Sequence, residues 1–448
     1  MRNHFIQFLA LFMITLGFSQ EKVAETSTFT LAEAVAFALE NNYSAINANR
    51  DIIDAQKQKW EVIASGLPQV SGAVTYQNQL KQPVTVIPAE IFGGEPGTFE
   101  EVIFGQAQNA NATATLRQQI FDGSYIVGVQ ATKSFLRYSD NNKEKTDLEV
   151  RKAVTEAYGN VLLSQESVSI FEKNKDALET NLFETEKLFE NGLGDEESVE
   201  QLQITLSSVE NQLKNAIRLE KITLQMLNLV LGIAIDAPTK LSENLDDLAQ
   251  EKVDPTLLDY DFNIENNVDY KLALNLNEQR YFEHKLAKSR ALPTLNAFIN
   301  YGSSAFADDF NFLNSDQQWF DSSVLGFDLS IPIFSSGKRS ATTARAKIAL
   351  EKAKTQLSEA EEQIRLQLES SKSNYVLAIE QYETAKDNLN LAERIENKNQ
   401  IKYSEGLASS FELRQAQTQL YDAQQGYLQS MVEVINKKTD LEVILNEE

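Results

Sequence analysis

The side chains in this sequence that could do chemistry are almost all carboxylates. The chain has 65 Asp and Glu residues against 41 Lys and Arg, a net charge of −24, with two His and no Cys. Without cysteine there is no disulfide, no thiolate zinc site and no lipid-modified N-terminal Cys. The two histidines, His4 and His284, provide neither a histidine metal cluster nor a conventional Ser-His-Asp nucleophile.

The carboxylates lie along polar faces and form no convergent acid-base pair, and the sequence has no phosphate loop. We therefore expect no enzyme, no cofactor and no metal site. A surface this acidic should repel nucleic acid rather than bind it. Two interpretations of the charge stay open, namely the solubility of a large helical surface and an electronegative interior.

Long helical hairpins must carry most of these charges. Between Val150 and Phe189, apolar or small residues recur at alternating spacings of four and three, broken only at Lys175. This period of 3.5 is typical of coiled-coil packing. The rhythm resumes at Val199 after a turn, so the sequence predicts a long helical hairpin over 125–231.

The same hairpin recurs near the C-terminus, over 338–445. Its apolar positions lie 214 residues after those of the first hairpin, and Glu405-Gly406-Leu407 corresponds to Asn191-Gly192-Leu193. Nearer the start of each copy the offset is 225, since Leu67-Pro68 corresponds to Leu292-Pro293. The sequence therefore indicates a tandem duplication.

Between the helices the apolar period changes from 3.5 to 2, which is typical of strands. This predicts a β-hairpin over 69–121 in the first copy and another over 294–334 in the second. The Pro- and Gly-rich stretch 88–105 is expected to be a loop. Each copy should thus consist of helix, two strands, long helix, turn and long helix.

The chain divides on this basis into four parts. Residues 1–19 have a basic start, an apolar run and a small-residue end, typical of a signal peptide. The first repeat then covers 20–235, a linker or equatorial segment 236–265, and the second repeat 266–448. No later window offers about 20 apolar residues, so no membrane-spanning helix is predicted.

Four strands per chain cannot close a barrel, because the smallest transmembrane barrels need about eight. One interpretation is a soluble cap on an elongated coiled-coil protein. The other is that three chains pool their strands into a twelve-stranded barrel. The alternating strands, the signal peptide and the aromatic residues near strand ends favour pooling. These aromatic residues are Tyr76, Phe104, Phe121, Tyr301 and Phe334.

The whole mature chain resembles the TolC-type outer-membrane efflux proteins. The resemblance rests on the duplication, on Leu67-Pro68 and Leu292-Pro293, and on the two glycine turns. It implies a mainly α fold with a small β part, in which tandem-duplicated hairpins form a trimeric α-barrel in the periplasm. A twelve-stranded transmembrane β-barrel, four strands from each chain, would top it in the lipid bilayer of the cell outer membrane.

The resemblance also implies a function as the exit duct of a tripartite efflux or type I secretion system. Such a duct passively conducts substrates handed over by a periplasmic membrane-fusion adaptor and an inner-membrane pump. Drug efflux, protein secretion and metal export all stay open at this point. The rival hypothesis is an elongated coiled-coil surface scaffold that transports nothing.

Site residues follow from the same resemblance. Family members place the glycine-containing turns at the periplasmic tip, where they meet the adaptor, which implies contacts through Gly192, Leu193, Gly406 and Leu407. Acidic residues can line the tunnel just beyond the second turn. Glu412 matches the first such position, whereas the next is Gln415, so the pair predicts a pore constriction with one acidic ring. The alternative for Glu412 is an exposed helix glutamate.

Overall fold

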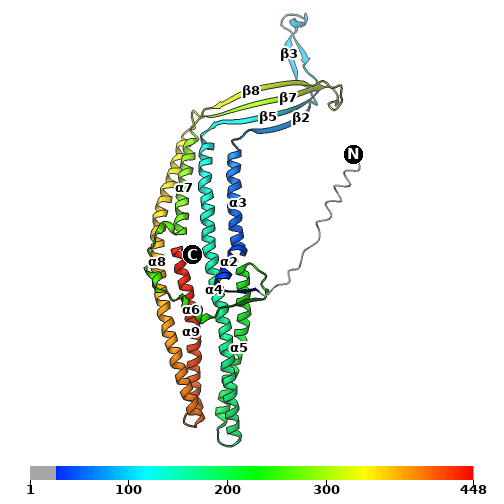
Figure 1. Ribbon diagram of the computed structural model, residues 1–448. Coiled ribbons are helices and arrows are strands. Elements are labelled where there is room, and N and C mark those ends of the chain that lie inside the picture. Colours follow the sequence, from blue (N-terminus) through cyan, green and yellow to red (C-terminus); the bar gives the residue numbers. More distant parts are fainter. Residues whose placement is uncertain (1–26, 447–448) are drawn as a thin grey trace. The chain divides into compact units, whose positions relative to one another are not determined.

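The computed structural model describes residues 27–446, so the expected signal peptide lies outside the described residues. The chain forms two compact units, and each takes segments from both repeats. We call residues 50–141 with 270–360 the sheet unit, and the remainder the helical unit (Figure 1). Over the part of the chain that the structure describes, no helix has the length and apolarity to cross a membrane.

The sheet unit is built on one antiparallel sheet with the strand order β2-β5-β7-β8, which joins the two expected hairpins through β5 and β7. A register irregularity interrupts the β5–β7 pairing near Phe121. The strands are β2 (Gln69–Asn78), β5 (Gln108–Asp122), β7 (Thr294–Ala307) and β8 (Phe320–Ser330).

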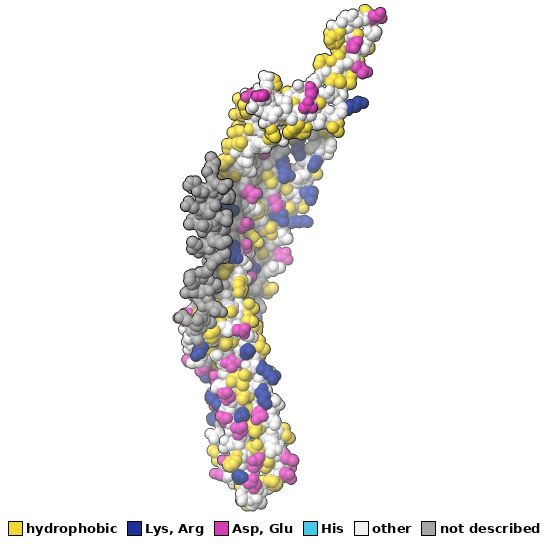
Figure 2. Space-filling view, turned by 90° about the vertical axis from the view of Figure 1, so that its right-hand side faces the viewer, with side chains coloured by type: hydrophobic (Ala, Val, Ile, Leu, Met, Phe, Trp, Pro, Cys, Tyr) yellow, Lys and Arg dark blue, Asp and Glu magenta, His cyan; other side chains and the backbone are white. Residues whose placement is uncertain are grey.

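The two faces of this sheet differ in chemistry, because side chains alternate along a strand. One cross-strand row consists of Val70, Leu116, Ile299 and Leu325, and the next row, on the opposite face, of Ser71, Thr115, Asn300 and Val324. The apolar face is exposed in the single chain: Val74 is 81% exposed and Phe327 67%. Figure 2 shows hydrophobic side chains gathered along the sheet.

The two strand connections differ between the repeats. The stretch 88–105, expected to be a loop, contains the strand β4 (Phe99–Ile103), which pairs with β3 (Val84–Pro88), and a short 3-10 helix η1 (Ala89–Phe92) between them. The expectation of a loop was therefore wrong for this strand. In the second repeat, residues 308–319 fold back so that Phe312, 7% exposed, packs with Ala110, Ala305 and Ala307.

The long helices carry the expected seam. In the helical unit the positions of the 3.5 period are buried or half-buried, as at Val154, Leu178, Tyr375 and Leu413, with Phe189 beside the first turn as the exception. The helices, some of which continue into the sheet unit, are α2 (Leu31–Asn41), α3 (Tyr43–Ala64), α4 (Gly123–Glu190), α5 (Glu196–Leu231), α7 (Val268–Ser289), α8 (Lys338–Ser404) and α9 (Ser410–Leu445).

The linker packs on the helical unit rather than forming a domain. Tyr375 of α8 donates its hydroxyl proton to the carbonyl of Lys252 (2.7 Å) and accepts from the N–H of Asp254 (2.9 Å). The linker's elements are β6 (Thr239–Leu241), which pairs in parallel with β1 (Ser27–Phe29), then α6 (Leu245–Lys252), η2 (Pro255–Asp259) and η3 (Ile264–Asn266).

The duplication is visible in one recurring joint. The Asn42 amide donates to the carbonyl of Val230 (2.6 Å), and the Asn267 amide donates to the carbonyl of Ile444 (2.9 Å). Each Asn side-chain oxygen also accepts a hydrogen bond from a backbone N–H in the first turn of the following helix. One side chain therefore caps the end of one helix and the start of another. These pairs repeat the offsets of 225 and 214 found in the sequence.

Candidate functional site

The two turns between long helices lie in the helical unit and share one backbone conformation. Gly192 and Gly406 both have φ +75°, a left-handed value that favours glycine. After Gly192, the Leu193 N–H donates to the carbonyl of Leu188 (2.9 Å), and after Gly406 the Leu407 N–H donates to that of Lys402 (2.7 Å). This Schellman closure leaves both leucines outward, with Leu193 78% and Leu407 74% exposed.

The helix that follows each turn is capped by the same pair of positions. The acidic residue comes first in one pair and the hydroxyl residue comes first in the other. Asp195 accepts from the backbone N–H of Ser198 (2.7 Å) at the start of α5. Ser409 accepts from the N–H of Glu412 (3.3 Å) at the start of α9, and Glu412 Oε2 accepts in return from the Ser409 N–H (2.8 Å). The second arrangement is a capping box, and the first is a simple Asp cap.

Glu412 is therefore an exposed carboxylate held at a fixed place beside the second turn. Hydrogen bonds from the backbone N–H and hydroxyl of Ser409 lower the pKa of Glu412 below its ordinary value of 4.5. The carboxylate keeps its negative charge to lower pH than an ordinary glutamate. Gln415, almost one helical turn further on, is also exposed.

Polar side chains join the two hairpins near these turns. The amides of Asn181 on α4 and Gln400 on α8 bond reciprocally (3.1 and 2.8 Å), and the hydroxyls of Thr185 and Tyr403 lie 2.9 Å apart. On the other helices, Ser198 donates to Ser410 (3.0 Å). Hydrogen bonds depend on direction, so these contacts fix how the hairpins lie against each other.

A groove of about 910 Å³ runs between α5 and α9 beyond this junction. Its wall includes Ile204 and Phe411, 68% and 56% exposed, and the Arg414 guanidinium lies 5.4 Å from the centre of the Phe411 ring. Gln415 also lines the groove. Apolar side chains beside a cation and amides make a surface that can receive a helical partner.

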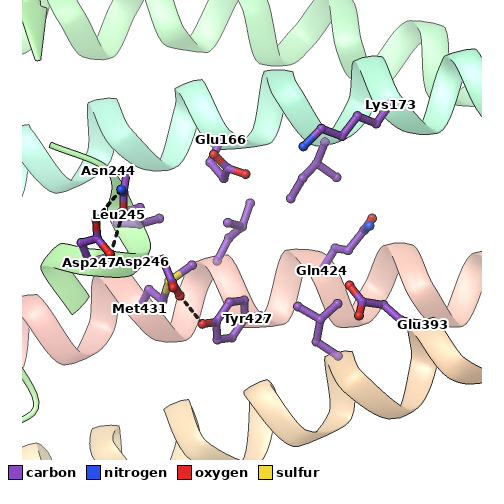
Figure 3. Close-up of a pocket in the computed structure, with 13 residues that line it drawn as sticks. Glu166, Lys173, Asn244, Leu245, Asp246, Asp247, Glu393, Gln424, Tyr427 and Met431 are labelled. Atoms are coloured by element: carbon purple, nitrogen blue, oxygen red, sulfur yellow. Dashed lines mark hydrogen bonds between the residues drawn. The ribbon is translucent and has the colours of Figure 1, made fainter. Parts of the chain in front are cut away.

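A second hollow, of about 590 Å³, lies where α6 meets α4, α8 and α9 (Figure 3). Glu166, Asp246 and Glu393 line it together with Lys173, and Tyr427 donates a short hydrogen bond to Asp246. Burial, then this bond, raises the pKa of Tyr427. The carboxylates come from three different helices, and among residues 27–446 no group of three or more potential ligands could hold a metal ion.

Sequence reasoning located the turns but not the polar junction between the hairpins. Thr185 belongs to the seam, but nothing local shows that Tyr403 is its partner. The break at Lys175 has a structural counterpart, because the neighbouring Asn174 is buried and donates to Gln424 (3.0 Å). A polar residue in a seam is the signal that could have pointed to these contacts.

Comparisons with known proteins agree with this architecture. Residues 271–447 match the family described as outer membrane efflux protein. No curated protein sequence matches the chain. The crystal structure of the outer membrane protein VceC of Vibrio cholerae is similar at 16% identity and TM-score 0.70, covering 93% of this chain and 96% of that one.

Two further solved structures have the same fold. The Campylobacter jejuni CmeC outer membrane channel matches at 17% identity and TM-score 0.71, over 96% of this chain and 90% of that chain. The open-state MtrE outer membrane channel of Neisseria gonorrhoeae matches at 15% identity and TM-score 0.68, over 93% and 89%. These findings confirm the resemblance drawn from the sequence and the mainly helical fold with a small sheet.

Proposed function

We propose that this protein, which shares its fold with outer membrane channels, is itself the outer-membrane exit duct of a tripartite efflux or type I secretion system. It passively conducts substrates delivered by a periplasmic adaptor and an inner-membrane pump, and it catalyses no reaction. The sheet lies in the outer membrane and the helical hairpins extend into the periplasm.

The observation that carries the proposal is the amphipathic sheet of the sheet unit. Val70, Ile299 and Leu325 stand in one exposed row on one face. The neighbouring row on the other face carries Ser71, Thr115 and Asn300, with Val324 at its end. A soluble protein rarely leaves so large an apolar surface in water. A strand pair with lipid on one side and water on the other needs this alternation.

The edges of the sheet support a trimer. β2 and β8 end the strand order, and within the described chain no other strand pairs with their outer edges. Unpaired backbone groups are costly in hydrocarbon, so such a sheet must close through other copies. Three copies give twelve strands, enough for a water-filled lumen lined by the polar face.

The turns are the proposed contact with the adaptor, through Gly192, Leu193, Gly406 and Leu407. Both leucines are exposed beside a glycine that holds the turn, which suits apolar anchors in a partner's groove. Asp195, Glu196 and Glu197 follow the first turn, so we expect basic residues on the adaptor near the start of α5. Glu190, before the turn, is paired with Lys187 (2.6 Å).

Glu412 and Gln415 are proposed to line the constriction of the tunnel. Three symmetry copies of Glu412 would form a ring of negative charge that attracts cations. The capping box supports this role, because it holds the carboxylate in place and keeps it ionised. An exposed helix glutamate without a lumenal role would leave ion selectivity unchanged on substitution.

Single-channel recording in planar bilayers tests the function directly. Purified protein should insert and give discrete conductance steps, with cation selectivity that falls in Glu412→Gln. The selectivity should be retained in Glu442→Gln, the same substitution near the far end of α9 at a half-buried glutamate beside Lys438. A non-transporting scaffold gives no conductance, and that result would remove the proposal. The exposed apolar sheet face is what makes the scaffold the weaker candidate.

A further inference from the structure

The β3–β4 hairpin is a surface whose partner the single chain does not contain. Apart from the buried Ala89 and the half-buried Ile87 and Val102, nearly all of its side chains are exposed. Figure 2 shows hydrophobic and acidic side chains next to each other on it. Its exposed apolar residues are Val84, Val86, Ile91, Phe92, Phe99, Ile103 and Phe104.

The register sorts these side chains by face. Val84 pairs with Ile103, and Pro88 with Phe99, on one face, whose only acid is Glu101 opposite Val86. The hairpin nonetheless has defined ends: the Ala89 N–H donates to the Thr98 carbonyl (3.0 Å) at its tip. Isolated two-stranded hairpins are marginally stable in water, so an ordered one with an apolar face needs a cover.

The hairpin also has two open edges. β3 and β4 form a sheet of their own, and no further strand in residues 27–446 pairs with either. Open edges with apolar side chains favour pairing with another strand. The stretch 81–105 has one Lys and four Glu, so an anionic lipid surface is a poor partner for it.

We propose that the hairpins of three copies of this chain pair edge to edge, β3 of one copy with β4 of the next, into a six-stranded collar that closes over the mouth of the channel. Side chains fill the centre of so small a ring, so the collar covers the apolar faces of the hairpins and has to part when substrates leave. The inference rests on the proposed trimer. The hairpin directly follows β2, the strand that would form the seam with the neighbouring copy, so the trimer itself brings three hairpins together. Tethering at one rim gives them a high effective concentration.

Charge selects this pairing over the alternatives. β4 carries Glu100 and Glu101, whereas β3 has no charged residue. Pairing β4 with β4 would place these carboxylates against their own copies, a destabilising arrangement on neighbouring strands. Pairing β3 with β4 avoids the repulsion, keeps every neighbour antiparallel and closes after three copies.

The absence of native cysteine makes the test clean. One chain carrying Thr85→Cys is co-expressed with a tagged chain carrying Glu100→Cys, so any disulfide must join two copies. The cysteines are then moved along β3 and β4 to cover the possible registers. A control scan, the seam scan, does the same for β2 of one copy and β8 of the next, starting from Thr75→Cys and Ser322→Cys. Oxidised membranes are read on non-reducing gels.

We expect disulfide-linked chains from the β3–β4 scan and from the seam scan, and none when both chains carry Thr85→Cys or both carry Glu100→Cys. Linkage at the seam without any in the β3–β4 scan overturns the collar and leaves the channel standing. Linkage in neither scan rejects the shared barrel, and with it the proposed function. Efficient Glu100 to Glu100 linkage would also contradict the collar.

Discussion

The two repeats of this chain are alike in their helices and sheet and differ where the chain turns. The strand connection of the first repeat forms the β3–β4 hairpin, whereas residues 308–319 of the second fold back onto the sheet. At the turns between the long helices, Gly192 is followed by Asp195, Glu196 and Glu197, whereas Gly406 is followed at the same positions by Ser409, Ser410 and Phe411. Packing between helices and between strands restricts the sequences of the shared parts. The turns and strand connections are free to differ according to what each of them contacts.

The largest expected effect comes from a part that the repeats share, the apolar sheet face. Val74→Arg in the first repeat and Leu325→Arg in the second should each cost about 2–4 kcal/mol per chain if the residue lies near the bilayer midplane. The amount of trimer in the outer-membrane fraction should fall in these variants, and this amount is the quantity to measure. Thr75→Arg and Ser322→Arg, on the polar face, are the controls. Equal loss from both faces would contradict the assignment of lipid and lumen sides.

The back-folded connection should contribute to stability in the second repeat. Phe312→Ala removes a ring that is 7% exposed and should cost about 3 kcal/mol. Phe310→Ala, in the same loop but 61% exposed, should cost much less. Urea unfolding of the detergent-solubilised protein compares the two variants. Similar costs would mean that the loop does not pack on the sheet as described.

The two turn glycines test a backbone conformation that both repeats share. Gly192→Ala and Gly406→Ala should each cost about 1–2 kcal/mol, because both positions have a positive φ. Gly426→Ala, inside α9 with open space around it, should instead stabilise by up to about 1 kcal/mol. Thermal unfolding reports all three, and a harmless change at either turn would show that its backbone is not held left-handed.

The charge difference between the turns should appear in adaptor binding. Reversing Glu196 and Glu197 together should weaken binding a few-fold, by about 1 kcal/mol, as expected for exposed charge pairs. Glu405→Lys at the second turn should change it less. Binding to the purified adaptor at two salt concentrations gives the measurement. Equal effects at the two turns would contradict the proposal that the adaptor's basic residues lie at the first turn.

The smallest expected effect is the pH dependence of the cap at Glu412. Its folded pKa is lowered, so the bond to Ser409 contributes stability above the ordinary value of 4.5, and this contribution is lost as pH falls through the lowered pKa. Melting temperatures of wild type and Glu412→Gln should therefore differ at neutral pH and converge in acid. A constant difference across the titration would refute the ionised cap.

Periodicity sufficed for much of this fold. The 3.5 period gave the long hairpins, because their seams are continuous, and the period of 2 gave the strands of the amphipathic sheet. It failed at Phe99–Ile103, where a short strand stands among Pro and Gly residues. It could not show the pairing of β1 with β6 or of Asn181 with Gln400, because these partners lie some 200 residues apart and leave no local pattern.

The same limit applies to the candidate site. The turns were found from glycine and a shared offset, and their exposure agrees with a contact surface. The capping box at Ser409 and Glu412 has a readable spacing, yet its effect on the glutamate charge follows only from the bond geometry. The groove between α5 and α9 depends on how two hairpins pack, which no single stretch of sequence encodes.

The central claim is that three copies share one wall, and the mass of the protein extracted from outer membranes tests it most directly. Native mass spectrometry of the detergent-released complex should give three chains, with the trimer lost in Val74→Arg and kept in Thr75→Arg. A single chain at every detergent concentration, from a sample that retains its helical circular dichroism, would contradict the account.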